Sequence, residues 1–100
     1  MFIHHVYFWL KPDAGKAAKE NLIADCRSLL AKVPGVQQLW AGEPAGNQRE
    51  IVDNSYSVAL AVVFLDRAAH DAYQEHPLHL EFIARHEPHW QRLRVYDFIG

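Results

Sequence analysis

The segment Tyr56-Ser57-Val58-Ala59-Leu60-Ala61-Val62-Val63-Phe64-Leu65 predicts a strand with two apolar faces, and this feature limits the possible folds. Side chains alternate between the faces of a strand, which gives two sets: Tyr56, Val58, Leu60, Val62 and Phe64 on one face, and Ala59, Ala61, Val63 and Leu65 on the other. An antiparallel strand with one face in water normally alternates apolar with polar residues. The segment therefore predicts a strand that is covered on both faces.

A second strand, predicted over residues 2–11, repeats this pattern near the start of the chain. One face would carry Phe2, Val6, Phe8 and Leu10, and the other would carry Ile3, Tyr7 and Trp9. The turn residues Pro12-Asp13-Ala14-Gly15 follow it directly. Both of these strands therefore need covering layers on two sides.

The stretch that follows the first turn changes to a helical period. Apolar residues recur three or four positions apart between residues 16 and 33, at Ala18, Leu22, Cys26, Leu29 and Val33. Pro34-Gly35 is expected to end this helix. Residues 36–42 predict a weaker strand, and the polar stretch 43–54 predicts a loop.

The last third of the chain predicts a broken helix and a final strand. Asp66 can cap a helix over residues 67–76, with Ala69, Ala72 and Tyr73 on its packed face. Pro77 interrupts that helix, a short piece over 78–86 follows, and residues 90–99 close the chain as a strand. The order β-α-β-β-α-β is typical of the ferredoxin-like α+β fold, an antiparallel four-stranded sheet with helices on one face.

The second face of this sheet requires a cover that the predicted helices cannot provide. A second copy of the same sheet is the simplest cover, and a two-fold dimer is the commonest homo-oligomer. We therefore expect a homodimer.

Length and composition limit the class of protein. A chain of 100 residues supports one domain, which we place over residues 1–100, and 50% hydrophobic with 22% charged residues is a globular composition. The net charge of −2, with scattered Lys and Arg, argues against a nucleic-acid partner.

No apolar run is long enough to cross a membrane and no signal segment is evident, so we expect a cytoplasmic protein. The single cysteine, Cys26, is interpreted as a core residue.

The chain has an unusually high number of histidines, seven in 100 residues. Three of them and one tyrosine are candidates for chemistry: His4, His76, His79 and Tyr73. Tyr73 and His76 are three residues apart and share a helix face, while Pro77 turns the chain so that His79 can approach. A tyrosine hydroxyl beside an imidazole is a suitable acid/base pair for removing a proton next to a carbonyl. Alternatively, His76 and His79 only bond backbone groups at the helix break.

A metal site is the other chemistry that these histidines could support. His76 and His79, with His4, would supply the three imidazoles of a catalytic zinc site. Pro77 disrupts the helical geometry of that pair, and no carboxylate or cysteine completes a known ligand motif, so we expect no metal there. The remaining histidines of the C-terminal half are interpreted as exposed: His70, His86 and His89.

Three segments resemble the stress-responsive dimeric α/β-barrel family, in the same order and at the same spacing. They are His4-His5-Val6-Tyr7-Phe8-Trp9-Leu10-Lys11, Ala72-Tyr73-Gln74-Glu75-His76-Pro77-Leu78-His79 and Val95-Tyr96-Asp97-Phe98. The resemblance covers essentially the whole chain. It implies a ferredoxin-like protomer whose sheet pairs across a two-fold axis into a closed barrel, and it assigns the family's strand-one histidine to His4, leaving His5 on the opposite face.

The family includes a plant polyketide cyclase that closes a ring without a cofactor, and the resemblance places its tyrosine and histidine pair on Tyr73 and His79. Our leading hypothesis is thus a small-molecule pocket lined by His4, Tyr73, His76 and His79, with His79 as general base and Tyr73 as donor to the oxyanion. His4 or His76 would bind the substrate, and neither metal nor organic cofactor is needed. The rivals are a non-catalytic stress or ligand-binding dimer and a cofactor-independent monooxygenase, because related dimeric barrels include such enzymes.

Overall fold

The structure, a computed structural model, describes residues 1–100. Its elements follow the predicted order: β1 (Phe2–Leu10), α1 (Gly15–Ser28), β2 (Val36–Gly42), β3 (Val58–Phe64), α2 (Arg67–Glu75), α3 (Pro77–His86) and β4 (Trp90–Ile99). Short 3₁₀ turns at Leu30–Lys32 and Glu87–His89 lead into β2 and β4. No helix is both long and apolar enough to span a membrane.

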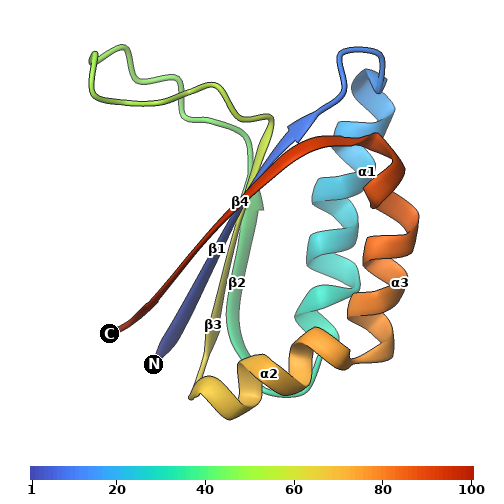
Figure 1. The fold of residues 1–100 in the computed structure, drawn as a ribbon, viewed down its shortest axis with the longest axis vertical. Coiled ribbons are helices and arrows are strands. Elements are labelled where there is room, and N and C mark those ends of the chain that lie inside the picture. The colour runs from blue at the N-terminus through green and yellow to red at the C-terminus, as the bar shows by residue number, and fades with distance from the viewer.

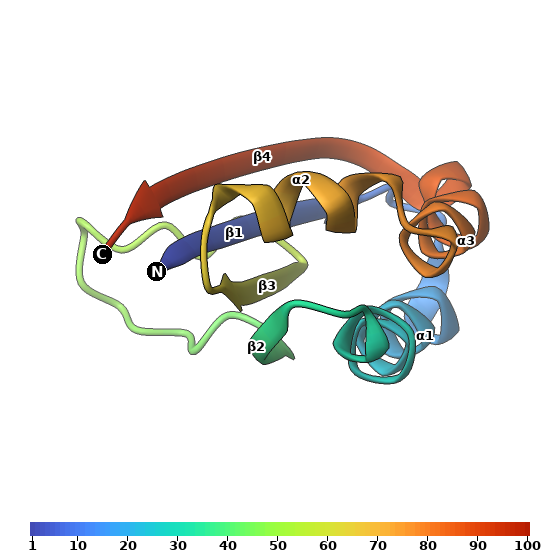
Figure 2. The same ribbon diagram turned by 90° about the horizontal axis from the view of Figure 1, so that it is seen from below.

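The four strands form one antiparallel sheet in the order β2-β3-β1-β4, which is the ferredoxin-like fold that the sequence predicts. The two strands with apolar faces, β1 and β3, are the central ones. Figure 1 shows the three helices on one side of the sheet and the segment between β2 and β3 on the other. Figure 2 shows α1 and α3 lying next to each other, and Figure 1 shows α2 at the lower end of the sheet, which is also the end of both chain termini.

The core lies between the sheet and the helices. Alternate side chains of β1 and β3 are buried there: Phe2, His4, Val6 and Phe8, and Val58, Leu60, Val62 and Phe64. Leu22 and Cys26 of α1 pack onto this layer and are almost completely buried. The predicted faces are therefore confirmed within β1 and β3, but Tyr56 was wrongly assigned, because it precedes β3 and packs against Tyr7 on the opposite face. Burial raises the pKa of the Cys26 thiol to about 12, as expected for an unreactive core residue.

Two details of the helices differ from the sequence prediction. The first helix ends at Ser28 instead of Val33, because the residue before Pro34 is forced into an extended conformation and the chain tightens into a 3₁₀ turn. Val33 is still buried, but from the turn. On α2, Tyr73 and Ala69 pack inward four residues apart, whereas Ala72 points to solvent.

The break between α2 and α3 is built from local capping contacts. The Asp66 carboxylate accepts a hydrogen bond of 2.9 Å from the Ala69 N–H, which confirms the predicted cap of α2. Pro77 occupies the first turn of α3, where its missing N–H costs nothing. His76 caps α3, since its Nδ1 accepts the Leu78 N–H at 3.1 Å. The break is therefore a fixed junction.

The sheet face opposite the helices carries large apolar side chains without a cover. In the strand register, Ile3 pairs with Phe98 and His5 pairs with Tyr96, and these side chains share the face with Trp40 of β2. Trp40, Tyr96 and Phe98 are each more than half exposed. Residues 43–57 reach only part of this face, where Tyr56 packs its ring 5.0 Å from that of Tyr7.

Candidate functional site

A cavity of about 220 Å³ lies between the sheet and the helices α2 and α3. Three residues predicted from the sequence line it, namely His4, Tyr73 and His79, and most of the remaining lining is apolar. Val6 and Phe8 of β1 contribute to it, as do Leu93 and Val95 of β4. The cavity is therefore a small apolar chamber in which a few polar groups converge.

His79 stands in the first turn of α3, directly beside the junction with α2. Its Nδ1 lies 3.0 Å from the Gln74 carbonyl oxygen, which can only accept, so Nδ1 carries the proton and Nε2 keeps its lone pair. Burial lowers the pKa of His79, while the bond to the Gln74 carbonyl and the more distant histidines have smaller effects. His79 is therefore a neutral imidazole at pH 7 with one nitrogen free to take a proton.

Tyr73 lies next to His79, with ring centroids 4.6 Å apart. Its side chain is buried, and burial raises the pKa of its hydroxyl, so this group stays protonated. No protein group bonds this hydroxyl, yet the only fully enclosed side-chain polar atom without a partner is Trp90 Nε1. The Tyr73 hydroxyl therefore keeps a small accessible surface, and because Tyr73 lines the cavity, this group can donate to a ligand there.

His4 enters the same cavity from β1 and is held by Asp97 of β4. The His4 Nδ1 and an Asp97 carboxylate oxygen are 2.6 Å apart, and the two residues are direct partners in the strand register. Burial lowers the pKa of His4 and outweighs the opposing effect of the Asp97 hydrogen bond. Asp97 was not among the predicted site residues, although a carboxylate between Tyr96 and Phe98 is a polar outlier that could have indicated its role.

His76 does not line the cavity, because its Nδ1 is engaged at the start of α3. The structure thus brings His4, Tyr73 and His79 together and leaves His76 at the junction. Both His76 and His79 also bond backbone groups there, as the alternative interpretation of the sequence proposed.

Two histidines expected to be exposed are not. His86 is buried, and its Nε2 lies 2.7 Å from the Asp25 carboxylate, which joins α3 to α1. His70 stacks on the Phe2 ring at a centroid distance of 4.3 Å and is only partly accessible. These predictions were wrong because His70 of α2 faces the sheet and His86 of α3 faces α1. The helical period alone does not reveal which neighbour a helix face meets. His89 is exposed, as predicted.

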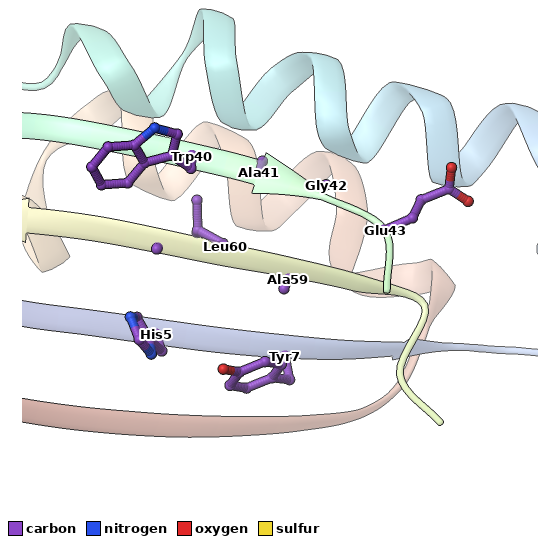
Figure 3. A pocket seen from close by; sticks show the side chains of 9 residues that line it. His5, Tyr7, Trp40, Ala41, Gly42, Glu43, Ala59 and Leu60 are labelled. Atoms are coloured by element: carbon purple, nitrogen blue, oxygen red, sulfur yellow. The ribbon is translucent and has the colours of Figure 1, made fainter. Parts of the chain in front are cut away.

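A broader hollow of about 300 Å³ lies on the uncovered face of the sheet. Figure 3 shows it between Trp40 on β2 and His5 with Tyr7 on β1, across the small residue Ala59 of β3. It is shallow and open, and no hydrogen bond holds its His5 ring in one orientation. The cavity on the helix side, with its fixed, neutral His79, is therefore the better candidate for chemistry.

Several solved structures share this fold. A Dabb family protein from Mesorhizobium loti matches with a TM-score of 0.80 at 23% identity, over 99% of this chain and 95% of that one. A dimeric ferredoxin-like protein from Thermobifida fusca matches with a TM-score of 0.85 at 20% identity, over 99% and 90%. A hydroxynitrile lyase from Passiflora edulis matches with a TM-score of 0.85 at 21% identity, over 99% and 92%. At these identities the likeness concerns the fold.

No curated protein sequence is similar enough to the chain to count as a match. The family model of the stress responsive A/B barrel domain, in contrast, matches residues 2–99, and the resemblance seen in the three sequence segments agrees with it. The chain therefore belongs to the stress responsive A/B barrel domain (Dabb) family.

Proposed function

We propose that the cavity binds a small apolar keto or phenolic compound and that Tyr73 and His79 perform acid/base chemistry on it without a cofactor. The observation that carries this proposal is the state of His79. Its Nδ1–H is fixed by the Gln74 carbonyl, and burial keeps the ring neutral, so that Nε2 is available as a base.

In this mechanism His79 Nε2 removes a proton from the carbon next to a carbonyl, and the Tyr73 hydroxyl donates to the oxygen of the resulting enolate. His4 serves a different part of the substrate. Because its Nδ1–H points at Asp97, its Nε2 is an acceptor and suits a substrate hydroxyl better than a carbonyl. His76 has no part in this mechanism, since its Nδ1 caps α3.

The fold is compatible with such chemistry, since one structurally similar protein is a hydroxynitrile lyase. Fold alone does not select an activity, and the contacts of the site have to carry the assignment. A second candidate, a non-catalytic ligand-binding dimer, is favoured by the backbone bonds of His76 and His79 at the helix junction.

The two candidates differ in what His79 does with its second nitrogen. The test uses phenylacetone in D₂O. NMR measures the rate at which the protons on the carbons next to its carbonyl are replaced by deuterium. Asparagine at position 79 can still donate to the Gln74 carbonyl but lacks the basic Nε2, so His79→Asn should remove the exchange and keep the fold. Tyr73→Phe should slow the exchange by roughly 10²-fold, the scale of one oxyanion donor.

The exchange should also depend on pH. A general base acts in its unprotonated form, and the pKa of His79 lies below its ordinary value of 6.5. The rate should therefore rise with pH, with its midpoint below pH 6.5, and stay level through neutrality. Two results would contradict the acid/base proposal and favour the non-catalytic candidate. One is exchange no faster than in buffer, and the other is equal exchange in the wild type and His79→Asn.

We also infer that the chain works as a homodimer that buries the uncovered face of the sheet. The support is physical: Trp40, Tyr96 and Phe98 lie exposed on one flat face, and a contiguous apolar patch of this kind indicates an interface. The similar protein from Thermobifida fusca is itself dimeric. A second copy is the partner that fits, because an identical sheet offers the same apolar face.

A further inference from the structure

We propose that His4, His70 and Asp97 form a binding site for a divalent transition metal ion such as Zn²⁺. Each of the three side chains offers one ligand atom, and all three atoms lie within 4.8 Å of one another. No other group of three such residues in the structure is this close together. The set differs from the one weighed from the sequence, in which His76 and His79 accompanied His4.

Three separate elements position these ligands. His4 of β1 and Asp97 of β4 are direct partners across the sheet, with the His4 Nδ1 already 2.6 Å from the carboxylate. His70 comes from α2, which packs over this end of the sheet, and its ring lies 5.0 Å from that of His4. Stacking on Phe2 keeps the His70 ring turned toward the sheet.

Two imidazoles and one carboxylate are a ligand set that Zn²⁺ and other first-row ions use, and they leave coordination positions for water or a substrate. Ligand atoms bound to zinc at about 2.1 Å lie roughly 3 to 3.5 Å from each other. Side-chain rotations that open the His4–Asp97 pair from 2.6 Å and bring the third atom inward by about 1 Å therefore complete the set, and the proton on His4 Nδ1 is released when the ion binds. The Asp97 side chain is 35% exposed, which gives an ion a path from solvent.

The hydrogen-bond partners of the His70 ring also suit metal binding. The His70 Nδ1 lies 3.1 Å from the Asp71 carboxylate, to which its N–H can donate, so Nε2 can bind an ion in place of its 3.2 Å contact with the Gln74 amide nitrogen. Metal-bound histidines commonly have such an outer partner, which fixes the ring orientation. The site adjoins the cavity through His4, and it does not depend on Tyr73 and His79. An ion on His4 Nδ1 would leave the proton on Nε2, so His4 would be an acceptor toward the cavity only in the metal-free protein.

The test is titration of chelator-treated protein with Zn²⁺ by calorimetry, and with Co²⁺ by visible absorption. We expect one ion per chain and Co²⁺ bands typical of nitrogen and oxygen ligands. His70→Phe keeps the stacking on Phe2 and removes one ligand, while Asp97→Asn removes the charged one. Each should weaken binding by about tenfold or more.

The matched control is His86→Gln. His86 and Asp25 form another histidine and carboxylate pair at 2.7 Å, but no third ligand joins them. This variant should bind Zn²⁺ like the wild type, with circular dichroism used to verify the fold of each variant.

A second measurement does not depend on any variant. In the wild type, Co²⁺ should shift or broaden the ring resonances of His4 and His70 and leave those of His86 and His89 unchanged. Absence of saturable binding, unchanged affinity in both ligand variants, or Co²⁺ effects confined to other histidines would mean an adventitious ion only and would overturn the proposal.

Discussion

The histidines of this chain occupy very different surroundings, although the sequence presents them alike. His4, His79 and His86 are buried, His89 is exposed, and the others are in between. The spacing around Pro77 was enough to predict that Tyr73 and His79 lie together, because both are close in sequence. The contacts of His4 with Asp97 and of His86 with Asp25 join residues far apart in the chain, and no local pattern reveals them.

The Asp25 carboxylate gives a pH-dependent prediction. Burial alone would raise the pKa of Asp25, but hydrogen bonds from His86 and Arg85 outweigh it and hold this pKa below its ordinary value of 3.8. A carboxyl with a lowered pKa in the folded state stabilises the protein above its unfolded pKa and loses that effect as the pH falls. Asp25→Asn should therefore cost about 1 kcal/mol of unfolding free energy at pH 7, measured by urea denaturation.

This difference between wild type and Asp25→Asn should shrink as the pH falls below 3.8, where the wild-type carboxyl takes up its proton. The control is Glu81→Gln, which breaks only an exposed ion pair with Arg85 within one helix and should change stability by less than about 0.5 kcal/mol. A cost for Asp25→Asn that is independent of pH would argue against this interpretation.

At the level of the elements, β1 and β3 could be predicted with both of their faces, since the period of a strand directly assigns each side chain. The helix break could also be predicted, because Asp66 and Pro77 act locally. The end of α1 could not, because the helical period runs on to Val33 while Pro34 changes the backbone before it. The apolar spacing therefore predicts the burial of Val33 correctly, but it places the end of the helix too late.

The uncovered sheet face predicts the effect of a charge placed on it. Trp40 is 58% exposed on this face, on the edge strand β2, so Trp40→Glu should prevent the sheets from pairing, because a buried unpaired charge is strongly unfavourable. Light scattering should give about twice the chain mass of 11.5 kDa for the wild type and a mass near 11.5 kDa for this variant.

Leu80 provides a matched control, as it is 54% exposed on α3, away from the sheet. Leu80→Glu adds the same charge at a similar exposure and should leave the dimer intact. A monomeric wild type, or equal masses for the two variants, would contradict the assignment of the interface to the sheet face.

In the molecule as a whole, the two faces of the sheet differ. The helix side contains the core and the cavity with Tyr73 and His79, while the opposite side leaves aromatic residues exposed. The sequence predicts that both faces are apolar, but it does not show that the helices leave a cavity beside β4. That cavity depends on how side chains from the sheet, α2 and α3 pack against one another, and the spacing of residues in the sequence does not determine this packing.

The proposed function requires that small molecules bind on the helix side of the sheet. The most direct measurement is NMR titration of the wild type with phenylacetone, following the aromatic side-chain resonances on both faces. We expect shifts for Tyr73 and His79, which line the cavity on the helix side, and none for His5 and Trp40, which line the hollow on the uncovered face. Shifts confined to His5 and Trp40 would contradict it.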